Sequence, residues 1–305
     1  MYNDNEIIGK SRSDLQHHYK QTHIPTLSSA TQDTITDLSA QTYQQQSKRC
    51  ISSPLIVIIP MYIDEDATAL LDILAQQDWS RTTIVYLNAY RYDDIGNSIT
   101  TEERWKEKKQ ELYTLINSYN NTILLDHLYN NKEAIGTIIA DLNDTVLITY
   151  PYTTEPIIIR CDADTRHLET DYLSNIQSLF NNNSHIEYST AHVRYTQPHR
   201  DRFFWLAETL SELAGYRNHH TTQEVPTYWP SMSYRASARI KIKWTQRDIS
   251  RMEDYVIARK VAQRYGSVES PDWSRWIRND SIVFCNPRRQ IQNILAWRYR
   301  HENTD

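Results

Sequence analysis

Glycine is scarce in this sequence, with only 5 glycines among 305 residues. Loops that wrap phosphate groups in backbone amides need closely spaced glycines, and the sequence contains neither GxGxxG nor GxxxxGK[ST]. The scarcity therefore argues against glycine-rich phosphate-binding loops.

Cysteine is equally sparse. Cys50, Cys161 and Cys285 lie far apart and form no CxxC pair, which is typical of reduced thiols in a cytoplasmic protein. The N-terminus lacks the apolar core of a signal peptide. The longest apolar run, "LIVIIPMYI", has about half the length needed to cross a bilayer. We expect a cytoplasmic protein without a transmembrane segment. Peripheral contact with the inner face of a membrane stays open, because the helix expected at 201–217 carries aromatic residues.

A surplus of positive charge is also missing. The net charge is -5, so nothing indicates a nucleic-acid partner, which usually needs a basic face. A hydrophobic content of 39% and a charged content of 23% fit a globular protein with a polar surface. A chain of this length is long enough to bury a substantial core.

The chain divides into three regions by composition. Residues 1–50 are rich in Gln, Ser, Thr and His with little apolar periodicity, and this predicts a poorly ordered N-terminal arm. Residues 51–182 alternate β-branched runs such as "PLIVIIP" with helical patterns such as "TTEERWKEKKQELYTLINSY". The alternation predicts an α/β fold with a mostly parallel central sheet and helices on both faces. Residues 183–305 are less regular and are expected to form the second half of the same domain.

Two carboxylates end one of the expected strands, in "IIIRCDADT". In an extended segment Asp162 and Asp164 would face the same side. Ligands of α/β sheets bind at the carboxyl ends of the strands, and Mg²⁺ or Mn²⁺ prefers hard oxygen ligands. The pair is thus a candidate clamp for a metal-bound diphosphate, although the pattern alone is more typical of a solvated turn.

A second acidic pair, Glu253 and Asp254 in "RMEDYV", opens an expected helix. Acids in a first helical turn are commonly dipole partners or caps. A carboxylate there could also serve as a general base that takes a proton from an attacking hydroxyl.

The order of these motifs resembles the family 2 glycosyltransferases of the GT-A (Rossmann-like) fold. "SPLIVIIPMYIDEDATALLDILAQQ" looks like the opening of that family, "RCDADT" like its DxD motif and "MEDYVIARKVAQRYG" like its downstream ED motif. The resemblance covers roughly residues 52 to 290. It departs from the family at Ile63, Asp64 and Asn88, where an Asn-Glu pair and an Asp are usual.

The resemblance implies a metal-assisted, inverting transfer of one sugar from a UDP- or GDP-linked donor to an acceptor hydroxyl of a carbohydrate, lipid-linked or protein acceptor. Asp164 would bind the divalent cation (Mn or Mg), and Asp162 the nucleotide or the metal. Asp254 would be the catalytic base, with Glu253 beside it. The nucleotide-sugar pocket would include further residues of the first half: Pro60, Tyr62, Glu65, Asn88 and Lys132.

The acceptor side is less defined. Trp229 could stack on a sugar or pack as an ordinary aromatic residue, and Arg288 and Arg289 could bind phosphate or form a surface basic pair. Two other functions remain open. A sugar-phosphate nucleotidyltransferase also needs acidic metal ligands, but it usually carries a glycine-rich triphosphate loop. A non-catalytic binding protein on the same fold would explain the altered positions.

Overall fold

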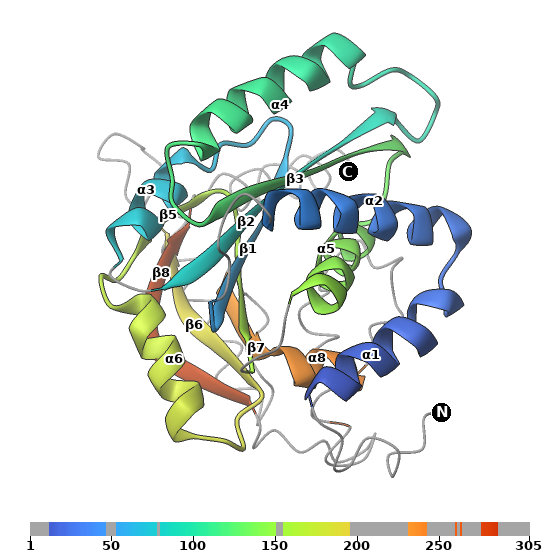
Figure 1. Cartoon of the computed structure of the whole chain (residues 1–305). Coiled ribbons are helices and arrows are strands. Elements are labelled where there is room, and N and C mark those ends of the chain that lie inside the picture. Colours follow the sequence, from blue (N-terminus) through green and yellow to red (C-terminus); the bar gives the residue numbers. More distant parts are fainter. Residues whose placement is uncertain are drawn as a thin grey trace, which may run out of the picture.

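The computed structural model describes residues 12–46, 53–77, 80–150, 155–195, 231–242 and 276–285, together with Lys260 and Gln263. An eight-stranded sheet in the order β3-β2-β1-β4-β7-β6-β8-β5 runs through the molecule (Figure 1). Its strands are β1 (Leu55–Tyr62), β2 (Arg81–Tyr92), β3 (Thr122–Asn131), β4 (Ile157–Cys161), β5 (Thr165–Leu168), β6 (Tyr188–Tyr195), β7 (Ser231–Arg235) and β8 (Trp276–Cys285).

The first half of the sheet is parallel. β1 pairs with β2 on one side and with β4 on the other, and β2 pairs with β3, all in parallel. The carboxyl ends of these four strands therefore lie along the same edge of the sheet. Beyond β4, the pairs β4–β7, β6–β7 and β5–β8 are antiparallel, whereas β6–β8 is parallel. The predicted α/β fold with a mostly parallel sheet is confirmed.

Helices cover both faces of the sheet (Figure 1). The side chains of β1 alternate between two buried clusters, because successive residues of a strand point to opposite faces. Ile56 and Ile58 join the cluster that includes residues of α1, α2, α5 and α8, whereas Leu55, Val57 and Ile59 join the cluster of α3, α4 and α6. The helices are α1 (Arg12–Thr22), α2 (Ser29–Gln46), α3 (Thr68–Gln76), α4 (Glu102–Ile116), α5 (Ile135–Thr149), α6 (Tyr172–Asn182) and α8 (Ala236–Ile242), with a 3₁₀ turn at Ile24–Thr26.

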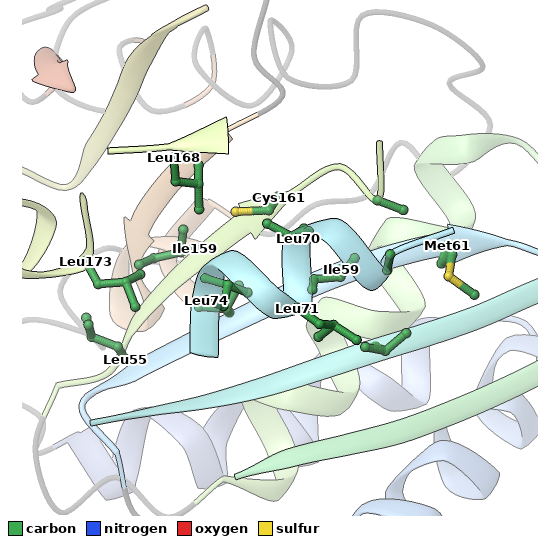
Figure 2. Packing of buried hydrophobic residues seen from close by; sticks show 14 of the residues in the cluster. Leu55, Ile59, Met61, Leu70, Leu71, Leu74, Ile159, Cys161, Leu168 and Leu173 are labelled. Atoms are coloured by element: carbon green, nitrogen blue, oxygen red, sulfur yellow. The ribbon is translucent and has the colours of Figure 1, made fainter. Parts of the chain in front are cut away.

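The second cluster shows why the sequence after β1 forms a helix that lies on the sheet. Leu70, Leu71 and Leu74 recur at helical spacing and are fully or almost fully buried. Figure 2 shows them on α3, above β1 and β4 and beside Ile59 and Cys161. The predicted helix following the first strand is thus confirmed, with its bounds at Thr68–Gln76.

The prediction of a poorly ordered N-terminal arm is wrong for residues 12–46. These residues form α1 and α2, and Leu15, Tyr19 and Leu38 are buried in the cluster that also contains α5. The apolar residues of this segment are few, which is why its periodicity is weak, but Leu15, Tyr19, Ile35 and Leu38 are buried. Polar contacts with distant segments supply the rest of the docking.

Two glutamines of α2 pair with the backbone of β3, which is the terminal strand of the sheet. The side chain of Gln41 donates to the carbonyl of Asp126 and accepts from its amide, both at 2.9 Å. Gln45 makes the same pair of bonds with Leu124, at 2.5 and 3.1 Å. Four residues of helix rise about 6 Å and two residues of strand about 6.6 Å, so the two spacings match. The glutamines therefore satisfy the outward-facing backbone groups of two residues of this edge strand.

The second half of the chain extends the same sheet. β6, β7 and β8 follow β4 in the strand order, so the expected less regular region contributes regular strands. The helix predicted at 201–217 lies outside the described residues. So does the helix predicted at 250–266, except for Lys260 and Gln263, which are helical. Within the described part of the chain, no helix combines the length and the apolar character that a bilayer crossing requires.

Candidate active site

The carboxyl edge of the parallel strands gathers the predicted residues of the first half. Tyr62 ends β1 and lies opposite Asn88 of β2. Ile58 of β1 lies opposite Arg160 of β4. Pro60 and Asp162 each follow two residues later along these two adjacent segments. The four parallel strands thus bring Pro60, Tyr62 and Asn88 to the same edge as the two aspartates, where ligands of α/β sheets bind.

Asp162 and Asp164 lie in a tight turn between β4 and β5. The amide of Thr165 donates to the carbonyl of Asp162 at 3.0 Å, and the turn buries Ala163 while both aspartates remain partly accessible. Of the two alternatives that the sequence left open, the structure has the turn and not the extended segment. The turn, rather than strand alternation, determines where the two carboxylates lie, because β4 ends at Cys161.

Asp162 has a cationic neighbour that sequence reasoning did not identify. The guanidinium nitrogen Nη2 of Arg160 lies 3.4 Å from Oδ1 of Asp162. The Arg160 side chain is 6% exposed and that of Asp162 is 21% exposed. A charged residue inside the apolar run "IIIRC" was the signal that could have revealed this pair.

The two carboxylates at this turn could bind a divalent cation that takes its other ligands from water and from a bound phosphate group. Among the described residues, no group of three or more His, Cys, Asp or Glu side chains could hold a metal on its own. Mg²⁺ commonly takes only one or two protein carboxylates and completes its coordination with water and substrate phosphates. Asp162 and Asp164 fit this second kind of site.

The loop after β1 is shaped by Glu65. Its Oε2 accepts from the amide of Tyr62 at 2.9 Å, and its own amide donates to the carbonyl of Tyr62 at 2.8 Å. These two hydrogen bonds lie within the loop and fix the turn that follows Tyr62. Through these bonds the carboxylate would influence a bound ligand indirectly, by fixing the conformation of the loop.

Asn88 is buried with its amide group held in one orientation. Its Nδ2 donates to the carbonyl of Met61 at 2.9 Å, across the β1–β2 pair. Asn88 is therefore held by a hydrogen bond to the backbone of Met61, the residue that precedes Tyr62.

An aromatic pair lies at the same edge. The rings of Tyr62 and Tyr90 are 5.4 Å apart, and the Tyr90 hydroxyl donates to the carbonyl of Glu133 at 3.2 Å. Burial, followed by the nearby Tyr62 and Glu133, raises the pKa of Tyr90 to about 12, and burial also raises the pKa of Tyr62. Both hydroxyls therefore stay protonated at neutral pH. Tyr90 was missed by sequence reasoning, because a Tyr inside a strand looks like ordinary packing.

Lys132 lies away from the aspartate turn. It follows β3 and its Nζ is 2.7 Å from the carboxylate of Asp94. β2 and β1 lie between β3 and β4, and with strands about 4.8 Å apart the backbones of β3 and β4 are separated by about 14 Å. The structure therefore places Lys132 at the far side of the edge that a bound nucleotide would span.

The remaining predicted site residues lie outside the described part of the chain. These are the acidic pair and the three candidates for the acceptor side: Glu253, Asp254, Trp229, Arg288 and Arg289. Within the described residues, the candidate site is thus formed by residues of β1, β2 and the β4–β5 turn.

Comparison with known proteins gives matches among solved structures only. No protein-family model matches the sequence, and no curated protein matches it. Similar solved structures include three of glucosyl-3-phosphoglycerate synthase from Mycobacterium tuberculosis. Its complex with Mn²⁺, UDP and phosphoglyceric acid is 11% identical over 85% of this chain and 77% of that chain, with a TM-score of 0.43.

The other two have TM-scores of 0.41 and are 10% identical. The complex with Mn²⁺, UDP-glucose and phosphoglyceric acid covers 80% of this chain and 72% of that chain. The complex with Mg²⁺ and UDP covers 83% of this chain and 75% of that chain.

Proposed function

We propose that the protein is a GT-A-type glycosyltransferase that transfers one sugar from a nucleotide-sugar donor to an acceptor hydroxyl. The observation that carries the proposal is the location of Asp162 and Asp164. They lie in a partly accessible turn at the carboxyl edge of four parallel strands, the edge that also carries Tyr62 and Asn88. A nucleotide at the Tyr62–Asn88 level would direct its diphosphate toward the two carboxylates.

Each residue has a role in this proposal. The ring of Tyr62 would lie beside the nucleobase of the donor. Asn88, which is hydrogen-bonded to the carbonyl of Met61, would lie under the same nucleobase. Asp164, with Asp162, holds a divalent cation (Mn or Mg), which would offset the charge that develops on the departing diphosphate. Asp254 removes the proton of the acceptor hydroxyl, whose oxygen then attacks the anomeric carbon and inverts it. The bond from that carbon to the diphosphate oxygen breaks, and its electron pair leaves with the diphosphate oxygen.

Titration calorimetry with UDP-glucose and GDP-linked sugars, with and without Mn²⁺, tests the donor side. We expect binding that depends on the metal, and at least a tenfold loss of affinity in Asp164→Asn, because the substitution removes one of two carboxylates. Asp171→Asn is the control, since it removes the same charge from an exposed residue just before α6.

Two outcomes contradict the proposal. One is metal-independent binding, or none, by the wild type. The other is pyrophosphate release from a nucleoside triphosphate and a sugar phosphate, which would identify a nucleotidyltransferase. Asp254→Asn separates binding from turnover: donor binding is retained, and release of the sugar from the donor is lost.

A further inference from the structure

Arg160 is a buried cation in a strand that is otherwise apolar. It is 5% exposed in β4, where its neighbours in sequence are isoleucines and Cys161. Burying a guanidinium is costly unless an anion or hydrogen bonds compensate for lost water. It forms an ion pair with Asp162, one of the two carboxylates of the candidate metal site.

The strand holds Arg160 in a fixed place. β4 is paired on both sides, so that Arg160 lies opposite Ile58 of β1 and opposite Met232 of β7. Cys161 points to the other face, where Figure 2 shows it near Leu70 and Leu168 of the second cluster. The guanidinium therefore approaches Asp162 from the α5 side, on a backbone that cannot shift easily.

We propose that Arg160 is a positioning residue, which orients the carboxylate of Asp162 and offsets its charge so that the site binds a divalent cation together with an anionic diphosphate rather than the cation alone. This inference rests on the proposed function. It adds a residue that touches neither substrate nor metal and acts through Asp162.

The charges explain the expected effect. Asp162 and Asp164 each carry a negative charge, and the positive charge of Arg160 offsets part of it. Without Arg160, the site attracts a free dication more strongly and repels a diphosphate more strongly, because both interactions scale with the local charge. The two affinities therefore move in opposite directions, whereas general damage to the fold would lower both.

The experiment measures Mn²⁺ binding by electron paramagnetic resonance and UDP binding by calorimetry at saturating Mn²⁺. In Arg160→Met we expect Mn²⁺ alone to bind about three- to tenfold more tightly and UDP to bind at least as much more weakly. Arg160→Lys keeps the charge and should return both affinities toward those of the wild type. Arg235→Met is the matched control. It removes a partly buried arginine from β7 opposite Ile157, three residues or roughly 10 Å along β4 from Arg160, and should change neither affinity.

A fall of both affinities in Arg160→Met, or no change in either, overturns the inference while leaving the proposed function intact. Failure of the wild type to bind UDP with Mn²⁺ refutes the proposed function itself. If Arg160→Met does not fold, Asp162→Asn and Asp164→Asn decide the matter on the accessible turn. Without metal, Asp162→Asn should bind UDP more tightly than Asp164→Asn, because Asp162 then no longer offsets the positive charge of Arg160, which attracts the diphosphate. Equal affinities would overturn the inference.

Discussion

At the scale of single residues, burial explains the altered acid–base chemistry around the β3 edge. His127 lies in β3 near Asp37 of α2 and Asp126, and Thr34 of α2 approaches its ring at 3.4 Å. Burial lowers the pKa of His127, although the two carboxylates act in the opposite direction. A neutral imidazole is thus favoured in the folded state.

This shift predicts a pH dependence of stability. The folded pKa is below the unfolded value, so the unfolded state binds more protons between the two. His127 therefore contributes fully above its unfolded pKa of about 6.5, and its contribution is lost as the pH falls toward the folded value. Urea unfolding at pH 8 and pH 5 should show a smaller loss of free energy on acidification in His127→Gln than in the wild type. Identical losses in the two proteins would contradict the assignment.

At the scale of elements, α2 acts as the cover of the sheet edge. An uncovered edge strand offers free backbone groups to other chains. Gln41 and Gln45 pair with these groups on Asp126 and Leu124, and Leu38 anchors the same helix in the core. A glutamine-rich sequence is therefore compatible with a well-packed helix when its amides replace a neighbouring strand.

Substitution of these glutamines tests the role of α2. Gln41→Leu and Gln45→Leu should each lower the free energy of unfolding by about 1 kcal/mol, because a backbone donor and acceptor lose their partners. Leucine has a helix propensity similar to that of glutamine, so α2 itself is not weakened. The double variant should also aggregate more readily. Gln44→Leu, at an exposed position of the same helix, is the control; an equal loss there, measured by urea unfolding, would contradict the edge-cover role.

At the scale of the whole molecule, one sheet joins both halves of the chain through the β4–β7 pair. β4 is thus the strand at which the parallel half ends, and the aspartate turn that follows it lies next to the second half. The donor side that we propose is formed by residues of the first half. The proposed catalytic base, Asp254, comes from the second half of the sequence, so the proposed transferase would draw its donor and acceptor sides from different halves.

The sequence allows the parallel half to be predicted, because its strands and helices have clear periodicities and "DAD" directly follows a buried strand. The docking of α2 was not predictable, since Gln41 and Gln45 contact residues 85 and 79 positions away. The turn at Asp162 was one of two alternatives that the sequence left open, because the pattern alone could not show that β4 ends at Cys161. The ion pair of Arg160 with Asp162 was missed because a single charged residue in an apolar strand does not indicate which residue it pairs with.

The most direct test of the central claim is anomalous scattering from Mn²⁺ in crystals of the protein grown with UDP and Mn²⁺. We predict a manganese peak between the carboxylate of Asp164 and the diphosphate of UDP, with the uracil ring of UDP near Tyr62 and Asn88. A nucleotide bound elsewhere, or a manganese peak that survives unchanged in Asp164→Asn crystals, would contradict the claim that the β4–β5 turn is the metal–diphosphate site.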